Sequence, residues 1–248
     1  MMQQMLVGLG GVSMPDVSYN LIGGGGGGIN GNGWAFQGAG GAGSVLVQGI
    51  FTAETDKQYF VLVGAAGAGS AAGAASNLGW YSGGEGVGYN QIGTSTGGGT
   101  GTFQGIGADG GSNTSYSGGA YGFFSGGGGA GAGGNGGNAG TRIAGNGGPG
   151  VAMPLHPSSL RVGGGGAGDG QNSGSGSATD GGGLRFGTAP ASRGGGGGAG
   201  NEPGASGRIV LRYGDSFPAP AATTGNPTVT VSGGYRYYDF TSSGSITF

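Results

Sequence analysis

Runs of consecutive glycine, the longest of six residues at 23–28, constrain this chain more than any other feature of its sequence. The chain has 76 glycines in 248 residues, several times the share of about 7% in ordinary proteins. Glycine has no side chain to bury, and ordering it costs roughly 0.5–1 kcal/mol more than ordering alanine. Such a chain needs many backbone hydrogen bonds between closely approaching segments, or it stays unfolded.

Three conformations suit long glycine blocks. Disorder is typical of glycine-rich chains without a strict period. Collagen requires glycine at every third position and abundant proline, whereas this chain has glycine in blocks and only nine prolines. A bundle of extended helices with three residues per turn requires a small residue at every third position, on the face that approaches a neighbour. The backbone N–H and C=O groups then form hydrogen bonds between neighbouring helices. Such series of small residues occur at Gly128, Gly131, Gly134, Gly137 and Gly140, and at Gly64, Gly67, Ser70, Gly73, Ser76 and Gly79.

Short runs rich in β-branched and aromatic residues interrupt the glycine blocks and predict strands. They lie at residues 44–51, 58–63, 208–213, 228–232, 235–241 and 245–248. The first two are predicted to pair as a hairpin. Prolines 218, 220 and 227 predict a linker before the fourth. No stretch has a helical period.

The sequence therefore predicts a mainly β and irregular fold. It combines a small antiparallel β-part with an elongated bundle of polyglycine-II-type helices and essentially no α-helix. We expect an N-terminal segment and β-part at 1–63, the glycine bundle at 64–204, and C-terminal strands that complete the β-part at 205–248.

Residues that carry chemistry are scarce. The chain has one histidine, no cysteine, eight Lys and Arg residues and ten Asp and Glu residues. His156 lies between Pro154 and Pro157, where a turn is expected. We predict that the chain is not an enzyme and has no catalytic, cofactor-binding or metal-binding residues. The scattered arginines argue against nucleic-acid binding, and no apolar run reaches the ~18 residues of a membrane span.

Aromatic residues gather between glycine blocks, where turns are expected at the ends of the bundle. Two interpretations stay open: the rings cap the bundle and shield its backbone, or they contact a receptor, since Tyr, Trp and Arg are favoured in binding hot spots. The candidate contact residues are Trp80, Tyr81, Tyr89, Tyr116, Tyr121, Phe123, Phe124, Arg185 and Phe186.

Four stretches occur in an order that resembles a known family. They are YNLIGGGGGG at 19–28, GGAGSVLV at 40–47, YFVLVGAAG at 59–67 and GASGRIVLRY at 204–213. Over about residues 19–213, this order resembles a glycine-rich domain common in bacteriophage tail-fibre and appendage proteins. The middle is similar to the polyglycine-helix adhesins of T-even-like phage long tail fibres, in which loops between the helices touch the host receptor.

The resemblance implies a non-enzymatic virion tail protein that acts in host attachment or tail architecture. Its expected partners are other tail proteins, a host surface receptor and further copies of itself. It is expected to assemble in the host cytoplasm and to be extracellular after release. The alternative is a purely structural filament, coat or decoration subunit without receptor binding. Binding of ice or polysaccharide by a flat face would need ranks of threonine, and the sequence has one local cluster at 94–102.

The C-terminal stretch 234–248 looks like the opening hairpin of the same domain, displaced to the end of the chain. We expect it to lie beside residues 17–22, either in its own chain or on a neighbouring subunit.

Overall fold

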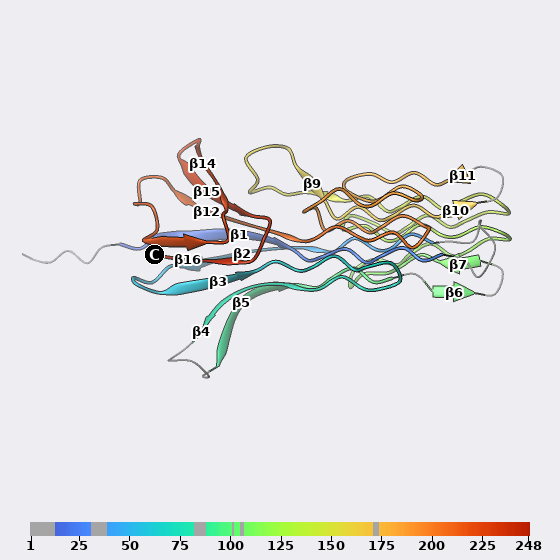
Figure 1. The fold of residues 1–248 in the computed structure, drawn as a ribbon. Helices are drawn as coiled ribbons and strands as arrows, with labels where there is room; N and C mark the ends of the chain where they lie inside the picture. The colour runs from blue at the N-terminus through green and yellow to red at the C-terminus, as the bar shows by residue number, and fades with distance from the viewer. Residues whose placement is uncertain (1–12, 31–38, 82–87, 101, 105–106, 171–173) are drawn as a thin grey trace, which may run out of the picture.

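A computed structural model describes residues 13–30, 39–81, 88–100, 102–104, 107–170 and 174–248. These residues contain no helix, and all of their strand pairs are antiparallel. Two five-stranded sheets lie at one end of an elongated molecule, and glycine-rich segments run from them to the other end (Figure 1). The predicted mainly β, helix-free fold is thus confirmed for the described residues.

The two large sheets take strands from both ends of the chain. The first has the order β14 (Thr228–Ser232), β15 (Tyr235–Phe240), β12 (Arg208–Gly214), β1 (Asp16–Ile22) and β2 (Leu46–Thr52). The second has the order β13 (Ala222–Thr224), β16 (Gly244–Thr247), β3 (Gln58–Leu62), β4 (Ser76–Tyr81) and β5 (Tyr89–Ser95). Three short pairs complete the set: β6 (Thr102–Gln104) with β7 (Gly107–Asp109), β8 (Val151–Ala152) with β9 (Arg161–Val162), and β10 (Asp169–Gly170) with β11 (Gly174–Ser175).

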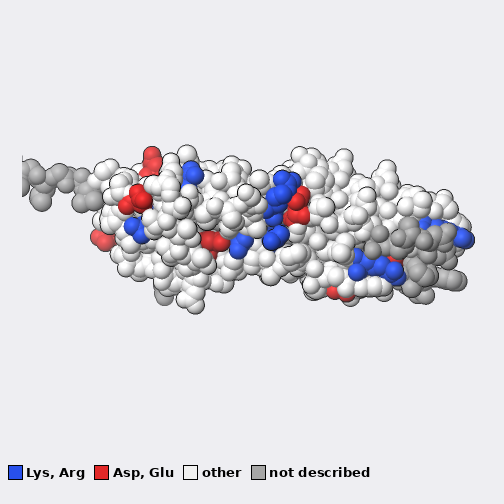
Figure 2. All heavy atoms as spheres, turned by 90° about the horizontal axis from the view of Figure 1, so that it is seen from above, with Lys and Arg blue, Asp and Glu red and all other residues white. Residues whose placement is uncertain are grey.

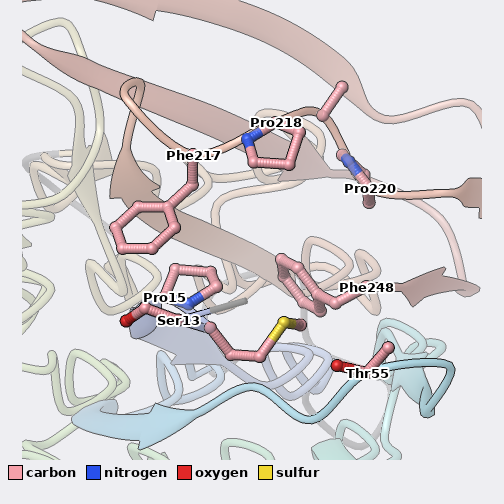
Figure 3. A pocket seen from close by; sticks show the side chains of 9 residues that line it. Ser13, Pro15, Thr55, Phe217, Pro218, Pro220 and Phe248 are labelled. Carbon is pink, nitrogen blue, oxygen red and sulfur yellow. The ribbon is translucent and has the colours of Figure 1, made fainter. Parts of the chain in front are cut away.

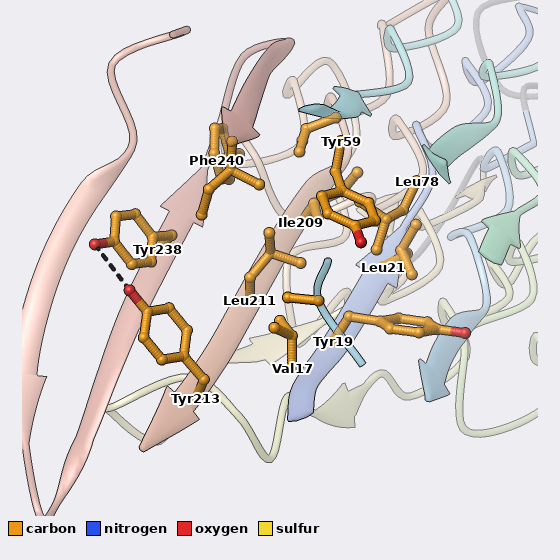
Figure 4. Packing of buried hydrophobic residues seen from close by; sticks show 13 residues of the cluster. Val17, Tyr19, Leu21, Tyr59, Leu78, Ile209, Leu211, Tyr213, Tyr238 and Phe240 are labelled. Atoms are coloured by element: carbon orange, nitrogen blue, oxygen red, sulfur yellow. Dashed lines mark hydrogen bonds between the residues drawn. The ribbon is translucent and has the colours of Figure 1, made fainter. Parts of the chain in front are cut away.

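The two sheets enclose one apolar core, and we call this part of the molecule the sandwich (Figure 4). Alternate residues of β1, β3, β12 and β15 face inward, as the two-residue period of a strand requires. The buried core residues are Val17, Tyr19, Leu21, Ala53, Tyr59, Val61, Leu78, Ile209, Leu211, Tyr213, Tyr238, Phe240 and Ile246. The hydroxyls of Tyr213 and Tyr238 meet at 3.5 Å. The sandwich is therefore held by ordinary side-chain packing.

A loop at residues 153–160 covers the outer face of the first sheet. Met153 is buried there with Ile22 and Val210. The loop is also anchored by polar contacts, since the Leu155 amide donates to Asn20 Oδ1 at 3.0 Å. For this reason β1 and β12 are buried on both faces.

The predicted hairpin between residues 44–51 and 58–63 is wrong. Strand β2 pairs with β1 in the first sheet, and β3 pairs with β16 and β4 in the second. The connection crosses the end of the sandwich, where Ala53 is buried and its amide donates to the Pro15 carbonyl at 3.0 Å. Crossing lets both strands turn apolar residues into the shared core, which a flat hairpin would not allow.

The C-terminal strands also differ in place from the prediction. Strand β15 belongs to the same sheet as β1 and to the same chain, but β12 lies between the two. Strand β16 enters the second sheet beside β3. The stretch expected to be a proline linker contains β13, which pairs with β16.

The glycine-rich segments between the strands form what we call the glycine bundle: residues 23–29, 39–44, 64–75, 96–100, 110–150, 163–168 and 176–207. The sequence interpretation placed the bundle at 64–204. Within that range the structure places β4 and β5 in the sandwich, and it places residues 23–28, assigned to the N-terminal part, among the other glycine segments.

Backbone hydrogen bonds in the glycine bundle change partner at every residue and return to the same neighbour after three. The amides of residues 24–29 donate in this way to three neighbouring segments. The donor and acceptor pairs are Gly24 to Ala74, Gly27 to Ala71, Gly25 to Ala205, Gly28 to Glu202, Gly26 to Ala42 and Ile29 to Ala39, at N···O distances of 2.8–3.0 Å. The same period recurs in the amides of Gly126, Gly129 and Ala132, which donate to Asp169, Gly166 and Gly163.

Close approach of these backbones leaves no room for side chains around residues 24–28. A Cβ atom on any of these five glycines would lie 1.8–2.2 Å from a carbonyl oxygen of a neighbouring segment. At Gly140, near the surface, the nearest atom would be the Ile143 Cβ at 3.6 Å. Glycine is thus required by contact in the centre and not at every position outside it.

Buried serines connect the sandwich to the glycine bundle. The Gly23 amide donates to the hydroxyls of Ser44 and Ser95 at 2.9 and 3.1 Å, and the Gly64 amide donates to Ser76 Oγ at 2.8 Å. These three serines are fully buried. They satisfy amides at the points where the strand ladders end and the glycine segments begin.

Candidate functional site

Two tight turns lie together at the far end of the glycine bundle. Residues 122–125 form one and 140–143 the other, and each is closed by a β-bridge between its first and last residue. The Arg142 amide donates to the Phe123 carbonyl at 2.7 Å, which joins the turns. Ser125 also bridges to Gly170 of β10, which Figure 1 shows at the end opposite the sandwich.

These turns carry large, exposed side chains. Phe123 is 47% exposed and Ile143 is 56% exposed. The rings of Phe123 and Phe124 meet edge to face, with centroids 4.3 Å apart. The Arg142 guanidinium lies 5.9 Å from the centroid of the Phe124 ring. We call Tyr121, Phe123, Phe124, Arg142 and Ile143 the tip surface.

The backbone of the tip surface is unusual for such large residues. Phe124 and Arg142 have φ angles of 56° and 58°, and Phe186 in a nearby turn has 50°. This left-handed region costs an L-residue roughly 1–2 kcal/mol, and glycine adopts it without that cost. A chain with 76 glycines nevertheless has bulky side chains here, so the side chains themselves are the candidates for a role.

A third turn, at residues 184–187, carries a buried ion pair and two exposed apolar groups. Arg185 Nε lies 3.0 Å from Asp169 Oδ1, and its guanidinium lies 4.3 Å from the centroid of the Phe186 ring. Leu184 and Phe186 are exposed. Burial raises the pKa of Asp169 to about 6, and the positive charge of Arg185 opposes that rise.

The other predicted contact residues lie elsewhere. Trp80 and Tyr89 belong to the β4–β5 hairpin of the sandwich and not to a turn of the bundle. Trp80 packs edge to face on Tyr59 at 6.1 Å, and Lys57 Nζ lies 3.8 Å from its ring centroid. The backbone of Tyr81 pairs with Tyr89, while its side chain lies outside the described residues.

Tyr116 is half-buried in the 113–116 turn, where its amide donates to Asn113 Oδ1 at 2.8 Å. Of the nine predicted residues, Tyr121, Phe123 and Phe124 therefore lie in the tip surface, and Arg185 and Phe186 lie in the turn at 184–187. Sequence reasoning missed Arg142 and Ile143. Their signal was a run of larger residues between glycine blocks, at 141–143, without an aromatic residue.

The single histidine fastens the 153–160 loop to the first sheet. His156 Nε2 lies 3.3 Å from Asp239 Oδ2, and Arg208 Nε lies 2.9 Å from Asp239 Oδ1. His156 Nδ1 faces the Ser158 hydroxyl at 2.9 Å within the same turn. The carboxylate of Asp239 thus contacts two basic side chains, and these contacts hold the loop against the sheet.

At the opposite end from the tip surface, the sandwich has an apolar pocket of about 310 Å³ (Figure 3). None of the described residues that line it is charged, and they are Ser13, Met14, Pro15, Thr55, Phe217, Pro218, Ala219, Pro220 and Phe248. In Figure 2, uncharged residues make up most of the visible face, and several basic atoms lie next to acidic ones. The described residues contain no group of three or more His, Asp or Glu side chains placed to hold a metal ion. Among them there is also no helix that is long and apolar enough to cross a membrane.

The order of strands and glycine segments agrees with a comparison of the sequence with known families. Residues 11–214 match the family described as glycine-rich domain. The chain belongs to this family. The glycine-rich domain thus covers β1 to β12, and β13 to β16 lie beyond it. No curated protein and no solved structure matches the chain significantly.

Proposed function

We propose that the segments of the glycine bundle are helices of the polyglycine-II type. A period of three in the backbone hydrogen bonds supports this, since such helices have three residues per turn and no internal hydrogen bonds. Between antiparallel neighbours, a donor three residues later in one segment bonds to an acceptor three residues earlier in the other, which fits the same geometry. Far-UV circular dichroism of the purified protein should show the strong negative band of extended three-fold helices near 200 nm. A spectrum that β-sheet alone accounts for would argue against them.

The chain as a whole is proposed to be a non-enzymatic attachment or architectural protein of the kind found in phage tails. The observation that carries this proposal is the tip surface. Bulky residues in a left-handed backbone conformation lie at the end of a glycine framework, opposite the sandwich that holds the C-terminus. In this proposal the sandwich end joins other tail proteins. The tip surface then meets a receptor on the host cell, outside the cell and as part of a virion.

Direct cell binding tests this function. Fluorescently labelled protein is mixed with a panel of intact bacterial strains, and surface binding is measured by flow cytometry. We expect binding to at least one strain and a loss of at least tenfold for the double variant Phe123→Ser, Ile143→Ser. The variant Tyr235→Ser, in the sandwich, is the matched control and should bind normally. Absence of binding to every strain, or equal binding by the tip variant, would contradict the proposal.

The alternative is a structural subunit of a filament, coat or decoration layer without receptor affinity. The observation that favours it is the exposed edge strand β14, which is suited to assembly between copies. Tip variants that assemble normally in a protein without cell binding would support this alternative.

A further inference from the structure

Strand β14 is the outermost strand of the first sheet, and no described strand pairs with its free edge. Its hairpin with β15 projects from the body of the sandwich (Figure 1). Val229 and Val231 are 49% and 52% exposed, although both belong to a regular strand. An exposed edge of this kind presents unpaired N–H and C=O groups to another strand.

Natural proteins protect such edges with lysine, proline, inward charges or bulges. Strand β14 has none of these features: its register with β15 runs without a shift from Thr228 to Ser232. No charged residue occurs between Asp215 and Arg236. The opposite edge of the sheet is different, because β2 contacts β5 of the second sheet, and the Ser95 hydroxyl donates to the carbonyl of Val45, the residue before β2.

The hairpin geometry determines which backbone groups point outward. The turn has two residues, Gly233 and Gly234, with φ angles of 60° and 80°, so the pair that flanks it, Ser232 and Tyr235, is hydrogen-bonded. Hydrogen-bonded and non-hydrogen-bonded pairs alternate along antiparallel strands. Thr230 therefore bonds to β15, and the N–H and C=O groups of Val229 and Val231 point away from it.

We propose that β14 is a self-association surface that pairs antiparallel with β14 of a second copy of this chain, around a two-fold axis at Thr230. In this register Val229 of each copy faces Val231 of the other. Both residues have outward-pointing N–H and C=O groups, so they form hydrogen-bonded pairs. Thr230 faces Thr230 as a non-hydrogen-bonded pair, as its inward-pointing groups require. The first sheets of the two copies then join into one continuous sheet.

The side chains in this register are also complementary to themselves. Val229 lies opposite Tyr238 on β15, and Tyr238 belongs to the core cluster, so the valines lie on the core side of the sheet. Pairing gathers four valines on this side and leaves threonine and serine on the other. Because neither strand carries a charge, no like-charge repulsion opposes the contact.

Cysteine cross-linking tests both the contact and its register. The chain has no cysteine, so Thr230→Cys introduces a single thiol. Cα atoms of a non-hydrogen-bonded pair are about 4.5 Å apart, within the range for a disulfide. Thr228→Cys is the matched control, because its partner is Ser232 and the two thiols would be about 13 Å apart at ~3.3 Å per residue. Under mild oxidation, Thr230→Cys should form a covalent dimer, and Thr228→Cys should stay monomeric on a non-reducing gel.

Light scattering on the wild type and on variants without an introduced cysteine provides the second measurement. The wild type should have the mass of a dimer, and Val231→Lys should have that of a folded monomer. Ile50→Lys, on the opposite edge strand β2, should remain dimeric. A monomeric wild type at its highest soluble concentration would overturn the proposal, and so would equal cross-linking of both cysteine variants. The tip variant Phe123→Ser, Ile143→Ser should dimerise normally, so this test is independent of receptor binding.

Discussion

Leu211 in the sandwich is surrounded by side chains, whereas Gly25 in the glycine bundle is surrounded by backbone. The sandwich is stabilised by the burial of rings and aliphatic groups, which contributes about 25 cal/mol per Å² of apolar surface removed from water. The bundle has almost no such groups and relies on hydrogen bonds worth roughly 0.5–1.5 kcal/mol each. One chain thus uses two kinds of packing, and each tolerates a different change: a core loses stability when atoms are removed, and the bundle when atoms are added.

The largest effect is expected where a methyl group is added to the centre of the bundle. A Cβ on Gly25 would lie 1.9 Å from the Gly195 carbonyl oxygen. We expect Gly25→Ala to lower the free energy of unfolding by more than about 4 kcal/mol, or to prevent folding. Gly140→Ala is the control, and it should change stability by at most about 1 kcal/mol. Thermal denaturation of both variants measures this, and similar melting temperatures would show that the backbones are not in close contact.

The next largest effect is expected where atoms are removed from the sandwich. Leu211 is fully buried between the sheets, so Leu211→Ala should cost about 3 kcal/mol. Ile50, which is 68% exposed on β2, is the matched control, and Ile50→Ala should cost less than about 0.5 kcal/mol. Denaturant titration gives both values. Equal losses would mean that the sandwich is not the apolar core of the molecule.

Asp169 of β10, which continues the bundle segment 163–168, carries a buried carboxyl group whose titration reports its packing. The pKa of Asp169 is about 6 in the folded state and 3.8 ordinarily. The folded chain binds this proton more tightly than the unfolded chain. The contribution of Asp169 to stability is therefore present below pH 4 and lost as the pH rises to 6. The loss is on the order of 2–3 kcal/mol, at 1.36 kcal/mol per pKa unit.

The variant Asp169→Asn should remove this slope from unfolding free energies measured between pH 4 and 7. Asp180 is the control of opposite sign, because its hydrogen bond with Arg161 lowers its pKa. The contribution of Asp180 is present above pH 4 and lost at more acid pH. If the unfolding free energy of Asp169→Asn has the same pH dependence as that of the wild type, the Asp169 carboxyl group is exposed to water and its pKa is not raised.

The smallest effect is expected at the tip, and it has the opposite sign. Phe124→Gly relieves a φ of 56° and loses a ring contact with Phe123, so we expect a gain of up to about 1 kcal/mol. Phe123→Gly, at a residue without positive φ, should bring no gain. Melting temperatures compare the two, and the cell-binding assay should show a loss for both. A gain in stability with full binding would mean that the Phe124 side chain has no contact role.

The sequence predicted which residues form strands better than which strands pair. Residues 58–63 and 208–213 were recognisable from their β-branched and aromatic residues, and β3 and β12 lie there. The pairing of β2 was not predictable, because the five residues between β2 and β3 can either return within a sheet or cross to another. Local sequence does not distinguish these two outcomes. The choice depends on the core that the two sheets share.

The candidate site was predictable only in part, for a similar reason. The glycine blocks on both sides of residues 121–124 indicated a turn with exposed rings, and Phe123 and Phe124 lie in one. Arg142 and Ile143 join them through a hydrogen bond between residues that are far apart in the chain. Conversely, Trp80 looked like a turn residue because glycines flank it, but β4 pairs with β3 and places its ring against Tyr59.

The period of three in the hydrogen bonds has a consequence for how chains of this kind can change in length. An insertion of one or two residues into a glycine segment would redirect every later amide to the wrong neighbour. An insertion of three residues restores each amide to its own neighbour, provided that the antiparallel segments beside it lengthen as well. The distance between the sandwich and the tip surface can therefore change only in steps of three residues, and after each step the tip side chains point in the same direction as before.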